Sequence, residues 1–435
     1  MRGRVLNVVI PCIVVSALAC AGCGGQRVPD ANRTDSSSDE ASGGSVGTMI
    51  SGAACPARSV TNEPENKAES GSALWLQGFG DALEVTSVAS DSEGNALLAR
   101  SDRQTLKLDP NGALLWSKPF GSLVVTDTQG NAYLAGTLEG TLELGGHVLR
   151  AKGGRDVFVI KLDPNGNVLY GVTLGGSDDD EVLSLAVDSN ANAVVSGSGL
   201  GTVKLDGDAN VVWTKSFHGH IALDSFGNIL LTGALTGTVD FGGGGLTSAG
   251  GTDIFVAKLA PSGEHLFSRR FGDAAERQRG ETIAVDRSDN VLVGGVFDGA
   301  VDFGGGALSV PSGTCPAEVW CLTAGFVTKL DAQGRWLWSL ELGPMRALPG
   351  VAADSLGNVV LSGALPGGVW PYRIPLVSAL DPDGTELWRR FEWPETGVGA
   401  GRRVAVDPCD NVLWSLSVRP TLETDEQSYI AKLSP

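Results

Sequence analysis

A five-residue turn motif that recurs along the chain restricts the fold more than any other feature. It begins with Asp and ends with Asn, and apolar runs flank it, a pattern typical of a β-hairpin. Its fourth residue is Gly or, in three copies, Ala191, Asp289 or Asp410, so we expect a positive φ angle there. A small residue two positions before each Asp indicates a crowded place near the axis of a radial array. The copies span Asp91–Asn95, Asp127–Asn131, Asp188–Asn192, Asp224–Asn228, Asp286–Asn290, Asp354–Asn358 and Asp407–Asn411.

A second hairpin motif alternates with the first. Most copies read Lys-Leu-Asp followed by a turn, and an aromatic residue stands four positions after that turn. Two hairpins give four strands per repeat, and a spacing of roughly 52 residues is near that of radial β repeats. We therefore predict an all-β, seven-bladed β-propeller with four antiparallel strands per blade. The aromatics, which we expect to be buried between blades, are Trp116, Tyr170, Trp213, Phe267, Trp338 and Trp388.

The missing strand of the seventh repeat occurs at the opposite end of the domain. The last repeat reaches Pro435 without its aromatic strand, whereas Leu74–Gly80 matches Leu115–Gly121 in register. We therefore expect this N-terminal strand to complete the last blade beside Tyr429–Leu433, with Trp75 as the seventh aromatic. An open or eight-bladed ring, in which Leu74–Gly80 starts a separate unit, is the alternative.

Gly-rich segments interrupt three repeats at the same place. Insertions at one place in a repeat are expected on one face of the ring. They lie around Leu144–Gly146, Phe241–Gly245 and Phe303–Gly306.

Four segments share a pattern with a known repeat: Asp156–Gly166, Leu174–Glu181, Gly237–Gly243 and Thr252–Leu259. This pattern resembles the bacterial SBBP repeat, a seven-bladed β-propeller repeat of secreted proteins, over roughly residues 74–435. The recurring Leu-Asp-Pro-x-Gly-x-x-Leu-Trp phrase also resembles repeats of outer-membrane assembly and quinoprotein propellers. Neither resemblance supplies catalytic residues.

The N-terminus indicates export and lipid anchoring. Residues 1–22 combine Arg2 and Arg4 with an apolar run and small residues before two cysteines, as in a lipoprotein signal peptide. By resemblance to such signals, Cys23 or Cys20 is the lipidated residue; ordinary secretion is the alternative. Residues 23–72 are rich in Gly, Ser and Asp and predict a disordered tether, and residues 73–435 form the propeller. The residue after either cysteine is Ala21 or Gly24 rather than Asp, which by resemblance to other lipoproteins favours the outer membrane. The sequence does not decide between its periplasmic and its surface side.

Two disulfide bonds are expected in an oxidising compartment. Cys315 and Cys321 flank a short loop, which a local bridge would staple. Cys55 and Cys409 can meet only if the end of the tether packs beside the seventh repeat. If Cys23 carries the lipid, the other four cysteines of the mature chain form the two bridges. Lipidation at Cys20 would leave Cys23 as an odd, unpaired thiol, so the count favours Cys23.

The charge of the chain excludes some partners. A net charge of −18 argues against binding of nucleic acid or an anionic membrane by the folded domain. Membrane contact is therefore expected only through the N-terminal lipid, and the protein is expected to be a monomer.

Candidate chemical groups are few. His218 and His220 could share a strand face as zinc ligands, but surface histidines are favoured because no further Cys or His lies nearby. No cofactor is expected, apart from calcium as a weak possibility. Solvated loop charge is the favoured interpretation of its candidate ligands, because the 12-residue calcium-loop pattern is absent. These are Asp178, Asp179, Asp180 and Glu181 in one loop between repeats and Asp273 and Glu276 in another.

Two classes of function are compatible with these observations. The first is a non-enzymatic module of the cell envelope that binds a protein or a glycan through its loops. The second is a hydrolase or lyase with a site at the mouth of the central channel. We favour the first, because His is scarce and no catalytic constellation can be identified from spacing.

Overall fold

The computed structural model describes residues 70–81, 83–310, 323–345, 347–366, 373–391, 398–419 and 427–435. Within this part of the chain, no helix has the length and hydropathy of a membrane span. The predicted signal peptide lies outside the described residues, as do nearly all of the tether and Cys20, Cys23, Cys55, Cys315 and Cys321. Cys409 lies in the turn Asp407–Asn411, and both predicted bridges stay predictions.

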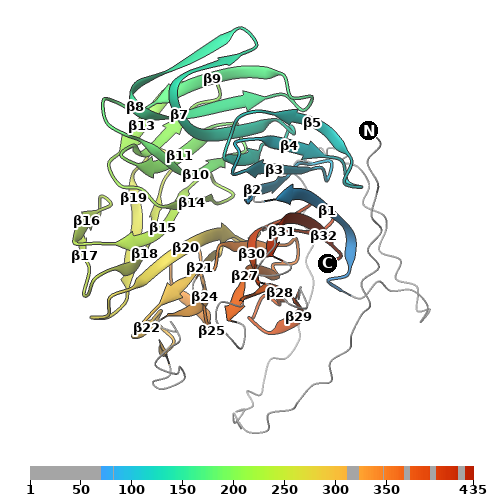
Figure 1. Ribbon diagram of the computed structural model, residues 1–435. Helices are drawn as coiled ribbons and strands as arrows, with labels where there is room; N and C mark the ends of the chain where they lie inside the picture. The colour runs from blue at the N-terminus through green and yellow to red at the C-terminus, as the bar shows by residue number, and fades with distance from the viewer. Residues whose placement is uncertain are drawn as a thin grey trace, which may run out of the picture. The chain divides into compact units, whose positions relative to one another are not determined.

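Seven four-stranded antiparallel sheets form a closed ring, which confirms the predicted β-propeller (Figure 1). The strands of each blade, from the channel outwards, are as follows: β2 (Val85–Ser90), β3 (Ala96–Arg100), β4 (Thr105–Leu108) and β5 (Leu114–Lys118) in blade 1; β6 (Leu123–Thr126), β7 (Ala132–Leu144), β8 (His147–Leu162) and β9 (Val168–Leu174) in blade 2; β10 (Glu181–Val187), β11 (Ala193–Ser198), β12 (Gly201–Leu205) and β13 (Val211–Lys215) in blade 3; β14 (His220–Leu223), β15 (Ile229–Leu235), β18 (Asp253–Leu259) and β19 (His265–Phe271) in blade 4; β20 (Gln278–Val285), β21 (Val291–Phe297), β24 (Ala324–Leu330) and β25 (Trp336–Pro344) in blade 5; β26 (Gly350–Ala353), β27 (Val359–Pro366), β28 (Arg373–Leu380) and β29 (Glu386–Phe391) in blade 6; β30 (Val398–Val406), β31 (Val412–Arg419), β32 (Gln427–Leu433) and β1 (Ala73–Asp81) in blade 7.

The two faces of the ring differ in their connections. In an antiparallel blade, the turn after the first strand and the turn after the third lie on one face, which we call the turn face. The connection after the second strand and the passage to the next blade lie on the other, the insert face. The extended end of the β7–β8 hairpin and the small hairpins β16–β17 (Thr238–Asp240, Gly245–Thr247) and β22–β23 (Ala300–Asp302, Ala307–Ser309) follow second strands. The Gly-rich segments therefore share one face, as predicted.

Apolar side chains hold neighbouring blades together. Seven hydrophobic clusters of the described residues each join two adjacent blades, for example Leu97 and Leu134 between blades 1 and 2. The repeated aromatics lie at the outer edge of these clusters and are half-buried, so the expectation of full burial is wrong. At this outer edge the indole N–H groups of Trp116, Trp213 and Trp338 donate to a proline carbonyl of the next blade.

Blade 7 is completed by the N-terminal strand, as predicted. β1 pairs with β32, and Trp75 lies opposite Lys432 just as Trp116 lies opposite Lys107 in blade 1. The two ends of the described chain also build one turn together: Ser434 donates its N–H to Ser72 O (2.8 Å) and accepts the N–H of Gly71 (3.1 Å). In blade 1, Asp109 makes the same two bonds with Ala113 and Gly112. The ring is therefore closed by backbone hydrogen bonds.

Candidate functional site

The Asp of each five-residue turn accepts hydrogen bonds from its own turn. Asp91 Oδ1 accepts the backbone N–H groups of Glu93 and Asn95 (both 3.0 Å), and its Oδ2 accepts Asn95 Nδ2 (2.8 Å). The fourth residue of all seven turns has a positive φ angle, between 59° at Asp289 and 82° at Gly357, as expected. These Asp residues are therefore structural.

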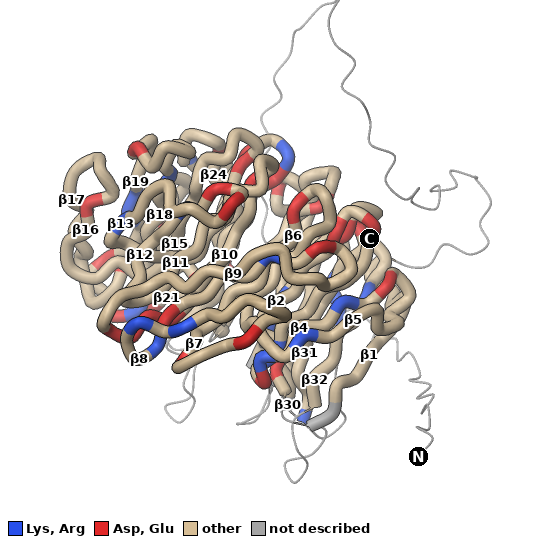
Figure 2. Tube along the Cα trace, turned by 90° about the horizontal axis from the view of Figure 1, so that it is seen from above, with Lys and Arg blue, Asp and Glu red and all other residues tan. Residues whose placement is uncertain are grey.

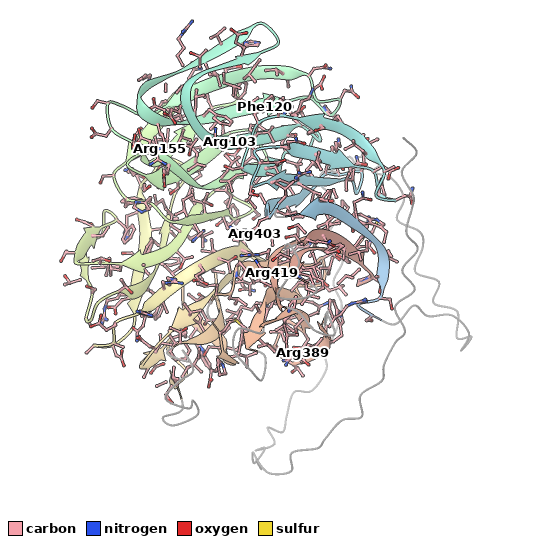
Figure 3. The ribbon with its side chains drawn as sticks, viewed as in Figure 1. Arg103, Phe120, Arg155, Arg389, Arg403 and Arg419 are labelled. Carbon is pink, nitrogen blue, oxygen red and sulfur yellow. The ribbon has the colours of Figure 1, made fainter. Side chains whose placement is uncertain are left out.

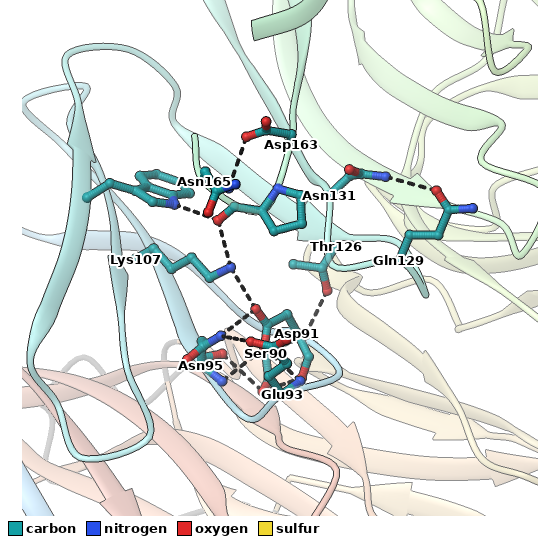
Figure 4. A network of polar contacts seen from close by, with 12 residues as sticks. Ser90, Asp91, Glu93, Asn95, Lys107, Thr126, Gln129, Asn131, Asp163 and Asn165 are labelled. Atoms are coloured by element: carbon teal, nitrogen blue, oxygen red, sulfur yellow. Dashed lines mark hydrogen bonds and ion pairs between the residues drawn. The ribbon is translucent and has the colours of Figure 1, made fainter. Parts of the chain in front are cut away.

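A lysine from the third strand completes each of these turns in six blades. Lys107 Nζ lies 2.8 Å from Asp91 Oδ2 and donates to Pro164 O in the next blade (3.1 Å), so it links two blades (Figure 4). The equivalent pairs are Lys161–Asp127, Lys204–Asp188, Lys258–Asp224, Lys329–Asp286 and Lys432–Asp407. Blade 6 has Ala379 at the lysine position, opposite Val360 of β27.

The turn face is therefore a neutralised surface. Burial alone would raise the pKa of Asp224, but Lys258 and Asn228 outweigh it, so the pKa is lowered. Asp286 has a lowered pKa in the same way, because Asn290 and Lys329 outweigh its burial. A cavity of about 420 Å³ opens on this face between the turns. It offers little net charge to a ligand, because in six of the seven blades a lysine pairs with the motif Asp.

The central channel is lined by equivalent residues of the seven innermost strands. The residue four positions before each motif Asp faces the channel cavity. Five of these positions carry small or neutral side chains, whereas blade 4 has a histidine and blade 7 an arginine. The set is Ser87, Leu123, Ser184, His220, Thr282, Gly350 and Arg403.

Arg403 lies at the channel and bonds to the two blades beside its own without meeting a carboxylate. Figure 3 places it near the centre of the ring, where the innermost strands converge. Its Nε donates to Thr86 O in blade 1 (3.0 Å) and its Nη1 to Pro349 O before blade 6 (3.0 Å). No salt bridge joins it to any carboxylate of the described residues. Burial and the neighbouring Arg402 charge lower the pKa of Arg403, which nevertheless stays cationic.

His220 faces the same space as Arg403. Burial, the Arg403 charge and His218 lower the pKa of His220 to about 4, so the imidazole is neutral at pH 7. His218 is exposed at the rim, which agrees with the prediction of surface histidines. The prediction is wrong for His220, because β14 is the innermost strand of its blade and turns this side chain towards the channel.

The remaining charges at this mouth are already paired. Arg279 Nε lies 2.7 Å from Glu281 Oε1, and Glu281 Oε2 accepts the N–H of Leu348 (2.7 Å). Arg402 forms an ion pair with Glu84. A cavity of about 420 Å³ on the insert face is lined by His218, His220, Arg279, Glu281 and Arg403, among others. Among these lining residues, the charge without an opposite partner is that of Arg403. The chain as a whole is strongly acidic, and its acidic and basic segments are interspersed around the ring (Figure 2).

The structure keeps the two predicted calcium loops apart. Both are passages between blades on the insert face, but one follows β9 and the other follows β19, two blades further round the ring. Asp179 and Glu181 pair with Arg155. In the described residues, no group of three or more His, Cys, Asp or Glu side chains is arranged to hold a metal ion.

Asp273, in the second loop, is engaged by neighbouring N–H groups. It accepts Ala275 N and Ala300 N (both 2.9 Å) and Gln278 Nε2 (2.7 Å). Burial alone would raise its pKa, but these bonds outweigh burial and lower it. Its role in this structure is to hold the start of β22 against the loop.

Arg403 was not singled out in the sequence, although a signal existed. Comparing the position four residues before each motif Asp across the repeats would have shown one cation among mostly neutral residues. A residue type that occurs in one repeat alone, such as Arg403 at this position, is not required by the fold that the repeats share.

Comparisons with known proteins find only distant structural similarity. No family model matches the chain, and no curated protein matches it. Among solved structures, BamB from Moraxella catarrhalis is 14% identical, covers 80% of this chain and 85% of its own, and has a TM-score of 0.37. The Dos1 propeller is 8% identical over 79% of this chain and 77% of its own, with a TM-score of 0.45. A protein of unknown function from Bacteroides caccae is 11% identical over 61% of this chain and 85% of its own, with a TM-score of 0.37.

Proposed function

We propose that the protein is a non-enzymatic binding module of the bacterial cell envelope, built from SBBP-type repeats and anchored by an N-terminal lipid. Its propeller binds an envelope protein or glycan at the channel mouth of the insert face. An anionic group of that partner, such as a carboxylate, pairs with Arg403. His220 offers a neutral hydrogen-bonding ring on the opposite side of the channel.

Arg403 is the observation that carries this proposal. A guanidinium that is largely removed from water and bonded only to neutral carbonyls gains most from an added anion. The mouth cavity leaves room for such a group, and the other arginines around it already have carboxylate partners. By contrast, the lysines of the turn face are matched to aspartates and offer no such charge.

The binding proposal is tested by capture from envelope extracts. The bait is the chain from Ser51 to Pro435, which contains every blade and forms one compact unit. We expect a protein or glycan to be retained by this bait and released by an excess of a small carboxylate such as glucuronate. Capture that is equal for the wild type and the Arg403→Met variant would place the binding surface elsewhere.

The anchor is tested separately. Inhibition of the lipoprotein signal peptidase with globomycin should leave an unprocessed precursor of the full chain. Normal maturation in the presence of globomycin would contradict lipid anchoring but would leave the binding proposal standing.

A further inference from the structure

Blade 2 buries two carboxylates beside each other without a basic partner. Asp156 in β8 is fully buried, and Asp180, which directly precedes β10, is 4% exposed. Asp156 Oδ2 accepts the backbone N–H groups of Lys152 and Gly153, and Asp180 Oδ2 accepts Gly176 N (3.1 Å). No salt bridge joins either carboxylate to a basic side chain of the described residues. Two adjacent buried negative charges are strongly unfavourable unless a positive charge accompanies them.

One oxygen of this pair has no partner. Asp156 Oδ1 is buried and accepts no hydrogen bond. It faces Asp180 Oδ2 across Gly175: a Cβ added at Gly175 would lie 2.0 Å from Asp156 Oδ1 and 2.4 Å from Asp180 Oδ2. Any side chain at Gly175 would clash with both carboxylates, so the glycine is what lets these two oxygens lie on either side of one point.

Blade 4 contains the same arrangement with different charges. Asp253 corresponds to Asp156, and Gln278 corresponds to Asp180: Gln278 N donates to Thr252 O as Asp180 N donates to Arg155 O. Asp253 Oδ1 is also buried without a hydrogen-bond partner, but in blade 4 the carboxylate is neutralised by Arg270, whose Nη1 lies 2.7 Å from Asp253 Oδ2. The position equivalent to Arg270 in blade 2 is Thr173, since each lies opposite the phenylalanine of the preceding strand. Blade 2 therefore has a carboxylate where blade 4 has the amide of Gln278, and it lacks the arginine.

We propose that blade 2 binds a calcium ion between Asp156 and Asp180. The two atoms that converge beside Gly175 are oxygens, the donor type of Ca²⁺ and Mg²⁺ rather than of zinc. Calcium takes 6–8 oxygen ligands in flexible geometry, so two carboxylates can be supplemented by backbone carbonyls and water. Magnesium demands a near-ideal octahedron and gives up its water reluctantly, which disfavours it in this site.

The ion would fasten the insert of blade 2 to the ring. Asp156 belongs to the long strand β8, whereas Gly175 and Asp180 belong to the passage from blade 2 to blade 3. Calcium bridging the two would hold the insert hairpin against the start of β10. This inference is independent of Arg403 and of the proposed function.

Calcium titration of the purified, full-length chain after EDTA treatment tests the site. We expect saturable binding by isothermal titration calorimetry, and a melting temperature that rises with CaCl₂ and much less with MgCl₂, because the ion binds the folded state. Asp180→Asn, which removes one of the two charges, should weaken calcium binding at least tenfold. A chain whose melting temperature is the same in EDTA and in 5 mM CaCl₂, and which takes up no calcium, would overturn the proposal.

A double variant that copies blade 4 guards against a folding defect. Thr173→Arg with Asp180→Gln introduces the counterparts of Arg270 and Gln278, so this chain should fold and should no longer need calcium. We expect its melting temperature in EDTA to equal or exceed that of the wild type, and the number of calcium ions bound per chain to fall by one. Unchanged calcium stoichiometry in this variant would show that the ion binds elsewhere.

Discussion

The two ends of the central channel differ in how their charges are arranged. At the turn face the same Asp, Asn and Lys contacts recur from blade to blade, and the acid–base pairs neutralise one another. At the insert face, Arg403 and His220 each occur once, and Arg403 has no carboxylate partner in the described part of the chain. The repeated polar groups thus maintain the ring, whereas Arg403 is not neutralised by the scaffold, which is why the proposed binding site is placed at this end.

The largest effect should come from breaking a repeated pair. Asp91→Ala leaves Lys107 buried without its counter-charge, so we expect a loss of about 3–5 kcal/mol in the free energy of unfolding. Asp354→Ala is the matched control, because blade 6 has Ala379 in place of the lysine, and should cost only about 1–2 kcal/mol for its turn hydrogen bonds. Urea unfolding measures both. Equal losses would mean that the lysine pairs do not carry the stability of the turn face.

The closing strand should be the next most sensitive feature. Trp75 donates its indole N–H to Pro110 O (2.8 Å) and packs on Gly112, but it is only half-buried. Trp75→Ala should therefore cost about 2–3 kcal/mol, below the range for a fully buried tryptophan. Trp338→Ala removes the same kind of contact, to Pro382 O, within a continuous blade. A smaller loss for Trp75 than for Trp338 would contradict a role for Trp75 in closure.

A pH effect is expected at the singular site. The pKa of His220 is about 4 in the folded protein and about 6.5 when unfolded, so the unfolded chain binds more protons between these values. Its contribution to stability is complete above pH 6.5 and is lost as the pH falls towards 4. Allowing for partial exposure, the loss should be about 1–2 kcal/mol. His220→Gln should flatten this part of the stability profile, and an unchanged profile would contradict the burial of His220.

The smallest effect on stability should come from Arg403 itself. Arg403→Met removes a desolvated charge, so the free energy of unfolding should change by less than about 1 kcal/mol or should increase. Arg402→Met removes the same charge from the next residue, which already pairs with Glu84, and serves as the control. A loss of stability for Arg403→Met as large as that for Asp91→Ala would remove the distinction between the two ends of the channel.

Features that recur in the sequence could be predicted from it. Ala191 at a positive φ angle and Trp75 as the seventh aromatic followed from comparing repeats, because equivalent residues meet equivalent surroundings. The lysine pairs were missed, because the motif Asp and its Lys lie in different hairpins of one repeat. The orphaned oxygen of Asp156 could not be foreseen, since it depends on the distance between β8 and the loop before β10. The half-burial of the aromatics likewise depends on how far each blade extends outwards.

The turn shared by the two chain ends bears on how the ring withstands force. A pull on the predicted tether would reach the propeller at Gly71, whose carbonyl accepts Arg390 Nη1 of blade 6 (2.8 Å) and whose N–H donates to Ser434 O. Trp388 of blade 6 also packs on Gly71. The load is thus divided between two blades before the pairing of β1 with β32 is strained. Under the proposed N-terminal anchoring, these contacts would resist peeling of the first strand.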